Sequence, residues 1–203
     1  MKEISVIMPV YLGNYPGCAK DRDYKFIRAV KSFIQQDLES KELVICSDGC
    51  DKSKEIYNRL FSWNKDIQFI KIEKQQMFSG IVRQTAIDNA CGEIICFLDS
   101  DDTFGKRHLT SIVNGIDDYD WCYWDDYVFY DNKQKFRSVE LKESFCSTGS
   151  FAYKKNLNVS WAGCNGYNQD WQFISKLLGV NKNYHKINSC SYIYHHIPNV
   201  VDN

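Results

Sequence analysis

Two aspartates that follow a buried apolar run are the first candidates for chemistry in this 203-residue chain. Asp99 and Asp101 are separated by Ser100 and come directly after the run Ile94-Ile95-Cys96-Phe97-Leu98. Carboxylates at this spacing can hold one hard divalent cation, while phosphate oxygens and water complete its shell. The pattern alone is weak, because two more Asp-x-Asp pairs occur, Asp21/Asp23 and Asp118/Asp120.

The same acidic stretch has a second interpretation as a helix cap. Asp102 or Thr103 could cap a helix over residues 104–116, since both residue types favour that position. Position in the sequence leaves the metal site and the cap both open.

A second acidic position, Asp48, lies in Ser47-Asp48-Gly49 after another apolar run. Its carboxylate could accept a hydrogen bond from a nucleobase edge, and Tyr11, which closely follows Pro9, could stack on that base. The alternatives are a turn with Gly49 at positive φ followed by an N-cap, and an aromatic at the rim.

The remaining candidates are a cation, an acid and two histidines. Arg83, just past Gly80, could meet a diphosphate or form a surface salt bridge. Asp170 could act as a general base or simply favour the start of a helix. His195 and His196 are adjacent on an expected strand, so at most one of them points into a site.

Alternating strand and helix patterns in the first half can position these side chains. Apolar runs predict strands over 4–8, 43–46, 67–72 and 94–98, and helical spacing predicts helices over 26–34, 56–61 and 80–90. Such units form a parallel sheet with helices on both faces, and ligands bind beyond the carboxyl ends of its strands. The fold class is therefore α/β, with the polar strand ends gathered on one rim.

The second half predicts a smaller, mixed or antiparallel part. Residues 121–130 are aromatic and β-rich, and a hairpin turn over 131–133 leads to a strand over 136–139. Further strands are expected over 150–153 and 190–196. A Gly/Asn-rich loop over 161–168 precedes a helix over 169–178. Aromatics in 121–130 and 161–168 could stack on sugars or fill the core.

Composition excludes several classes. Twenty-five basic and 26 acidic residues give a net charge of −1, which provides no drive toward nucleic acid. No run approaches the ~18 apolar residues of a membrane span, so we expect a cytoplasmic protein, attached to a membrane at most peripherally. Nine scattered cysteines without a C-x-x-C pair predict reduced core thiols rather than zinc or a disulfide framework.

These motifs, in this order, resemble a family 2 glycosyltransferase of the GT-A fold. The resemblance is densest to about residue 105 and is looser beyond it. It rests on residues 4–11, residues 42–51, Gly80 with Arg83, residues 90–102, and Gln169-Asp170-Trp171.

The resemblance implies a role for each position. Pro9, Tyr11, Asp48, Arg83, Asp99 and Ser100 would bind the nucleotide-sugar donor. A Mn²⁺ or Mg²⁺ ion on the diphosphate would be held by Asp101, Asp99 and His196, and Asp170 would be the catalytic base. The implied reaction moves a sugar from a UDP-sugar, the favoured donor, to a hydroxyl of a glycan or other acceptor. It inverts the configuration at the anomeric carbon.

The sequence also departs from the family pattern. Gln84 stands where Asn is usual, Gln169 where Glu is usual, and Tyr194-His195-His196 lacks an Arg, which leaves His195 or His196 as the metal-reaching histidine. Two alternatives follow: a nucleotide-binding module that lost catalysis, and a sugar-phosphate nucleotidyltransferase. The latter needs a basic Gly-rich loop after the first strand, and here the loop that begins at Pro9 has no basic residue before Lys20.

Domain organisation is expected to be simple. We expect residues 1–203 to form one domain, with a donor half over 1–105 and an acceptor half over 106–203. A chain of this length would be a minimal catalytic core without membrane helices, whose acceptor is soluble or is presented by a partner.

Overall fold

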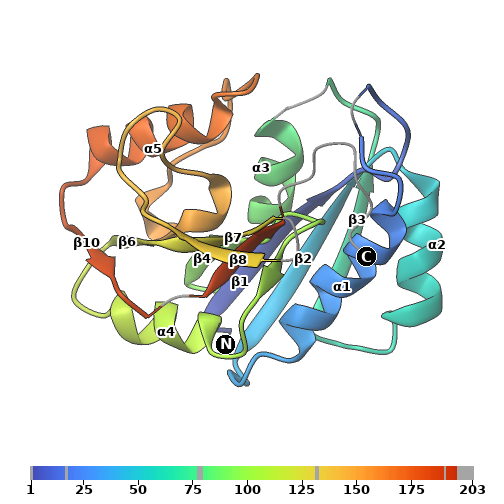
Figure 1. Cartoon of the computed structure of the whole chain (residues 1–203), viewed down its shortest axis with the longest axis horizontal. Coiled ribbons are helices and arrows are strands. Elements are labelled where there is room, and N and C mark those ends of the chain that lie inside the picture. The colour runs from blue at the N-terminus through green and yellow to red at the C-terminus, as the bar shows by residue number, and fades with distance from the viewer. Residues whose placement is uncertain (1, 17, 77–79, 131–132, 190, 196–203) are drawn as a thin grey trace.

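A seven-stranded mixed sheet forms the centre of the molecule (Figure 1). The computed structural model describes residues 2–16, 18–76, 80–130, 133–189 and 191–195. The strand order of this sheet is β10 (Tyr184–Ile187), β6 (Trp121–Trp124), β9 (Phe151–Lys154), β4 (Ile94–Phe97), β1 (Ile4–Val10), β2 (Lys41–Asp48) and β3 (Ile67–Ile72). Strands β4, β1, β2 and β3 are parallel, as expected, and only β9 runs antiparallel to its neighbours.

Helices cover both faces of this sheet. They are α1 (Arg22–Ile34), α2 (Asp51–Leu60), α3 (Gly80–Asp88), α4 (His108–Gly115) and α5 (Gln169–Val180). Successive residues of β1 point to opposite faces, so Val6 joins the core under α1, α2 and α4, while Ile7 joins the core under α3 and α5. The central strands are therefore buried on both sides, which explains their continuous apolar runs.

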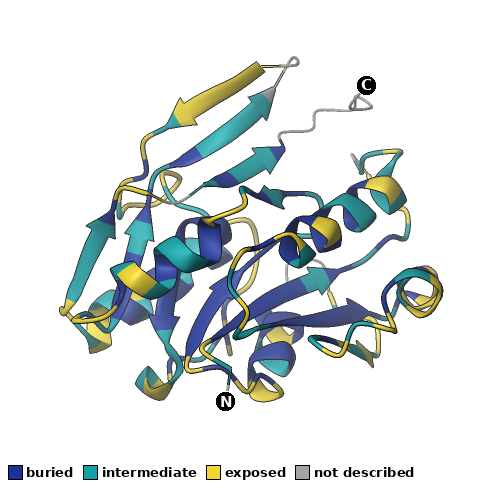
Figure 2. Ribbon diagram, turned by 90° about the horizontal axis from the view of Figure 1, so that it is seen from below, coloured by how far each residue is buried: buried dark blue, intermediate teal, exposed yellow. Residues whose placement is uncertain are grey.

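A second, four-stranded sheet lies beside the first. Its order is β5 (Thr103–Phe104), β11 (Tyr192–His195), β7 (Asp126–Tyr130) and β8 (Lys133–Arg137). The expected hairpin is confirmed by the antiparallel pairing of β7 with β8, while turn residues 131 and 132 lie outside the described residues. Figure 2 shows β8 as an exposed edge strand, with the central sheet buried.

The structure of the second half differs from the sequence expectations in the start of one helix and in one strand that was not predicted. The helix expected over 104–116 begins only at His108, because Thr103 and Phe104 pair with β11 instead. Arg107 occupies its N-cap position without a side-chain cap, so neither Asp102 nor Thr103 caps it. Strand β10 was not predicted, since its sequence Tyr-His-Lys-Ile alternates poorly and is mostly half-buried.

The cysteine prediction is confirmed for five residues. The free thiols of Cys46, Cys50, Cys96, Cys122 and Cys164 are buried. Cys91 is exposed, so it is not a core residue. Within the described ranges, no helix combines the length and the apolar character that crossing a membrane requires.

Candidate functional site

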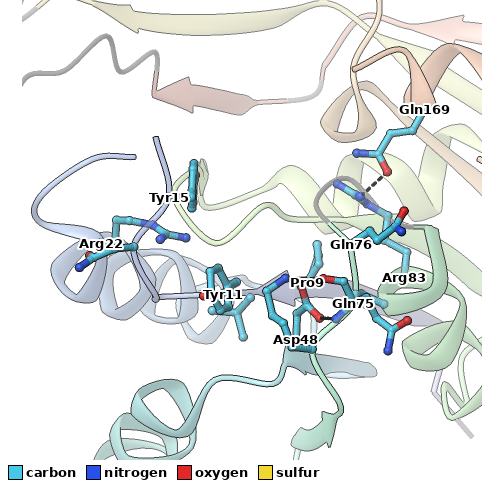
Figure 3. Close-up of a pocket in the computed structure, with 13 residues that line it drawn as sticks. Pro9, Tyr11, Tyr15, Arg22, Asp48, Gln75, Gln76, Arg83 and Gln169 are labelled. Atoms are coloured by element: carbon cyan, nitrogen blue, oxygen red, sulfur yellow. Dashed lines mark hydrogen bonds and ion pairs between the residues drawn. The ribbon is translucent and has the colours of Figure 1, made fainter. Parts of the chain in front are cut away.

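A pocket of about 480 Å³ opens at the carboxyl ends of β1 and β2 (Figure 3). Strand ends, the loop after β3 and the start of α5 all contribute to it. Besides Val10 and Val82, its lining comprises Pro9, Tyr11, Asn14, Tyr15, Arg22, Asp48, Lys74, Gln75, Gln76, Arg83 and Gln169. The expected rim is therefore a real cavity, and four of the sequence candidates line it: Pro9, Tyr11, Asp48 and Arg83.

Asp48 is fixed in this pocket through both carboxylate oxygens. The backbone amide of Gln75 donates to Oδ1 at 2.6 Å, and Lys74 Nζ lies 2.5 Å from Oδ2. Gly49 has φ 68°, and a Cβ there would come within 2.8 Å of Lys74, so glycine is required for this close approach. The turn interpretation is confirmed, but the cap is not, because α2 has Cys50 at its N-cap position with no side-chain cap.

Tyr11 supplies an aromatic surface close to Asp48 (Figure 3). Its ring centroid lies 4.4 Å from Lys74 Nζ and 5.8 Å from the Arg22 guanidinium carbon. Arg22 also stacks on Tyr15 at 4.6 Å, so the two rings and the cation form one wall. A ring with a neighbouring acceptor suits a planar, hydrogen-bonding ligand such as a nucleobase.

Arg83 closes the other end of the pocket. Its side chain is buried, so the interpretation as a surface salt bridge was wrong. Nη2 lies 3.1 Å from Asp99 Oδ1, and Nη1 donates to Gln169 Oε1 at 3.3 Å. The guanidinium also lies 5.0 Å from the Trp161 ring. Arg83 thereby connects the pocket to the acidic stretch after β4.

That acidic stretch contains three aspartates in different settings. Asp99 pairs with Arg83, whereas burial and the charge of Asp99 raise the pKa of half-buried Asp101 to about 6. Ser100 lies between them and is half-buried. Asp102 is buried and accepts hydrogen bonds from the Tyr192 hydroxyl at 2.6 Å and the His195 amide at 2.8 Å. Asp102 therefore anchors β11 and is not available to a ligand.

Asp170 lies in the first turn of α5 and is held by Thr148, which precedes β9. The Thr148 hydroxyl donates to Asp170 Oδ1 at 2.6 Å, and the Thr148 amide donates to Oδ2 at 3.2 Å. Burial, and to a smaller degree Asp99, raises the pKa of Asp170, while Arg83 and Thr148 oppose the rise. A carboxylate with raised proton affinity and fixed orientation suits a general base.

The histidines do not complete a metal site in the part of the chain that the structure describes. His195 is buried, and its Nε2 lies 3.0 Å from the Thr103 hydroxyl. His196 lies outside the described residues. Among the described residues, no group of three His, Cys, Asp or Glu side chains is placed to hold a metal ion.

Sequence reasoning missed several residues of the site, and three of them support candidate side chains directly. Thr148 positions Asp170, Tyr192 bonds Asp102 and accepts from the Asp99 amide at 3.3 Å, and Lys74 binds Asp48. No local motif marks any of them. The aromatics expected to stack on sugars were in part core residues, because Trp121, Trp124 and Trp161 are fully buried.

The sequence profile described as Glycosyl transferase family 2 matches residues 5–172, which include every site residue described above except those of β11. The chain belongs to this family. Family membership confirms the expected resemblance, and the α/β architecture confirms the expected fold.

Curated relatives agree with this family. The poly(ribitol-phosphate) beta-N-acetylglucosaminyltransferase TarP of Staphylococcus aureus (strain N315) is 28% identical over 116 residues, which are 56% of this chain and 33% of TarP. An uncharacterized glycosyltransferase of Haemophilus influenzae is 30% identical over 115 residues, which are 56% of this chain and 42% of that protein. The chain thus spans less than half of these relatives.

The fold is similar to that of two proteins whose structures are solved with nucleotide sugars. TarS 1-349 of S. aureus in complex with UDP-GlcNAc superposes with a TM-score of 0.74 at 19% identity, over 96% of this chain and 59% of that one. The mannosyltransferase PcManGT from Pyrobaculum calidifontis, in complex with GDP-Man and Mn²⁺, gives a TM-score of 0.66 at 13% identity, over 94% of this chain and 56% of that one.

Proposed function

We propose that this family 2 domain transfers a sugar from a nucleotide-diphospho-sugar to a hydroxyl of a glycan or other acceptor, with inversion at the anomeric carbon. The observation that carries the proposal is the chain of contacts from the pocket to Asp170. Arg83 joins the pocket to Asp99, and its Nη2 also donates to the Thr148 hydroxyl at 3.4 Å. That hydroxyl in turn donates to Asp170. A base candidate therefore lies beside a cation that can receive a diphosphate.

The base end of the donor would lie against Tyr11 and Asp48. Tyr11 offers a face for stacking, and Asp48 Oδ2 can accept from a base N–H once Lys74 shares or releases it. UDP is the nucleotide that we favour, in keeping with the UDP-GlcNAc complex of TarS. The diphosphate would then extend toward Arg83.

The two aspartates fit a Mn²⁺ or Mg²⁺ ion that arrives with the diphosphate. Asp101 and Asp99 repel one another, as the raised pKa of Asp101 indicates, and a divalent cation would relieve that repulsion. Two carboxylates with diphosphate oxygens and water make a hard-cation shell without a third protein ligand. When bound, the ion stabilises the negative charge of the leaving nucleoside diphosphate.

Asp170 would take the proton of the acceptor hydroxyl as its oxygen attacks the anomeric carbon. The new C–O bond forms on the face opposite the diphosphate, while the bond to the diphosphate oxygen breaks with its electron pair. One such displacement inverts the anomeric centre and needs no covalent enzyme intermediate. Arg83 would stabilise the charge that develops on the leaving group.

The departures from the family pattern are compatible with this chemistry. Gln169 still accepts a hydrogen bond from Arg83 but adds no negative charge, so more of the Arg83 charge remains for a diphosphate. Gln84 Oε1 accepts from the Trp161 amide at 2.8 Å and so anchors the loop that leads to α5. Both glutamines support the site through hydrogen bonds that their uncharged side-chain amides accept.

The deciding experiment measures thermal shifts with UDP, GDP and CDP in the presence of Mn²⁺, followed by donor hydrolysis across several sugar nucleotides. We expect a Mn²⁺-dependent UDP shift that Asp101→Ala abolishes. Asp118→Ala is the matched control, because Asp118 belongs to another Asp-x-Asp pair, is exposed and does not line the pocket.

Absence of nucleotide binding with every metal would refute the proposal. UDP binding without hydrolysis or transfer would instead favour a binding module that has lost catalysis. Pyrophosphate release from a nucleoside triphosphate and a sugar phosphate would favour a nucleotidyltransferase.

A further inference from the structure

Two exposed aromatic rings stand on the loops that lead into Thr148 and Asp170. Tyr167 is 88% exposed, more than any other large apolar side chain among the described residues, and Phe145 is 47% exposed. Neither ring contributes to the core, although exposing apolar surface has a cost in water. Single exposed apolar residues are ordinary, but two that approach one site from different loops suggest a ligand.

Chain connectivity places both rings close to the base candidate. Phe145 precedes Thr148 by three residues, and Tyr167 precedes Asp170 by three. Three residues span at most about 11 Å even when extended. Because Thr148 and Asp170 are hydrogen-bonded at 2.6 Å, the backbones of Phe145 and Tyr167 both lie within that reach of the same pair.

The two loops are tied together and held in shape. Asn168 Nδ2 donates to Glu143 Oε1 at 3.2 Å, which joins the loop of Tyr167 to the loop of Phe145. The Gln172 side chain bonds the Asn165 amide and carbonyl, each at 3.0 Å, and thereby closes the loop before α5 onto the helix. These contacts fix the backbone of the two loops that carry the rings.

Backbone geometry around Phe145 points to the same conclusion. Ser144 adopts φ 68°, an unfavourable value for a residue with a side chain, immediately before Phe145. Lys142 Nζ lies 3.8 Å from the Phe145 ring centroid and so covers one of the two ring faces with a cation. The loop therefore carries local backbone strain next to this exposed ring.

We propose that Phe145 and Tyr167 form the platform for the acceptor and that the acceptor presents a pyranose ring. A pyranose has an apolar C–H face that packs on an aromatic face, while its hydroxyls reach polar groups such as the Glu143 carboxylate. An acyclic polyol phosphate lacks such a face. This inference rests on the proposed function, because the platform matters only if Asp170 receives the proton of an acceptor hydroxyl.

The test is saturation-transfer NMR of the whole chain with UDP and Mn²⁺, using chitobiose, cellobiose and maltose, with ribitol as the acyclic comparator. We expect saturation on pyranose C–H protons for at least one disaccharide and none above background for ribitol. The double variant Phe145→Ala/Tyr167→Ala should lower the disaccharide signal at least about fivefold, since it removes both stacking faces. Tyr167→Phe should retain it.

Trp63→Ala is the matched control. Trp63 is 72% exposed, follows α2 and lies outside the pocket, so its loss should leave the disaccharide signal unchanged. The double variant should keep the UDP affinity and the donor hydrolysis of the parent chain, because neither ring lines the donor pocket.

Three outcomes would overturn the platform: undiminished disaccharide signals in the double variant, an equal loss in Trp63→Ala, or no disaccharide signal above that of ribitol. A parent chain that binds the disaccharides through these rings but binds no nucleotide would instead leave the platform standing and refute the proposed transferase.

Discussion

At the scale of single residues, Thr148 fixes both oxygens of the Asp170 carboxylate. Thr148→Val keeps the hydrogen bond from the backbone amide to Asp170 and the side-chain volume, but it removes the hydroxyl. We expect transfer kcat to fall about 10- to 100-fold, the loss typical of one hydrogen bond to a charged group. Affinity for UDP should fall much less, because Thr148 does not line the pocket and Arg83, which loses one hydrogen bond of 3.4 Å, keeps its contacts with Asp99 and Gln169. Steady-state kinetics and calorimetric titration measure the two quantities.

The pH profile separates this positioning role from a merely structural one. The Thr148 hydroxyl bond lowers the pKa of Asp170, so its removal should raise that pKa further. Since a base must be ionised to act, the acidic limb of the kcat profile should move to higher pH in Thr148→Val. Thr148→Ser should restore the profile, and an unshifted limb in the valine variant would contradict the assignment.

Asp101 provides a second residue-scale prediction, for stability in the presence of EDTA. Its pKa is raised from an ordinary value near 3.8 to about 6, so the folded state binds a proton that the unfolded state has released. Stability should therefore fall as pH rises from about 4 to about 6, by at most about 3 kcal/mol. Asp101→Asn should raise Tm by a few degrees at pH 7.5 and leave it unchanged at pH 4. Thermal unfolding followed by circular dichroism tests this, and equal Tm changes at both values would contradict it.

Residue types and spacing were sufficient to find the charged groups but not their supports. Asp99, Arg83 and Asp170 were identified because each follows a strand or begins a helix at one edge of the sheet. Thr148 carries no such signal, since its role depends on a fold that brings residues 22 positions apart together. One interpretation placed Arg83 at the surface, because the sequence does not show that the fold brings the Trp161 ring against its guanidinium.

At the scale of elements, the short turn η1 (Thr148–Ser150) carries Thr148 and packs against β11. A Cβ on Gly149 would come within 2.1 Å of the Tyr192 ring, and Tyr192 anchors Asp102. Gly149→Ala should therefore lower stability by about 1–3 kcal/mol. It should also weaken Mn²⁺-dependent UDP binding by displacing the aspartate loop.

Gly179 offers the opposite case. It lies in α5, and a Cβ there would meet nothing within 4 Å, so Gly179→Ala should stabilise the chain by about 1 kcal/mol. Urea unfolding of both variants measures the contrast. Similar effects of the two substitutions would show that close packing of η1 on Tyr192 is not what requires glycine at 149.

Elements with strong periodicity were predictable, and those created by pairing were not. The runs of β1, β2 and β4 are apolar because both faces of these strands are buried. Strand β5 has only two residues and exists because β11 pairs with it, so local sequence favoured a helix there. Strand β10 lies at the sheet edge, where weak burial leaves weak alternation.

At the scale of the whole molecule, the expected donor and acceptor halves share both hydrophobic cores. One core combines Phe33 of the first half with Trp124 of the second, and the other combines Ile7 with Phe173. The halves should therefore unfold together, even though a boundary near residue 105 divides their proposed roles. Shared packing supports the prediction of one domain, which stays a prediction until unfolding is measured.

Phe33→Ala tests that expectation, because Phe33 is fully buried in the first half, whereas four of the five tryptophans lie beyond residue 120. Loss of a buried phenylalanine side chain should cost about 3–5 kcal/mol. If the halves are one cooperative unit, tryptophan fluorescence and far-ultraviolet circular dichroism should report the same lowered urea midpoint. A fluorescence midpoint that stays at the parent value while the dichroism midpoint falls would show that the second half folds independently. A shared midpoint would mean that damage to the donor side also removes the Asp170 site, since the same sheet supports both.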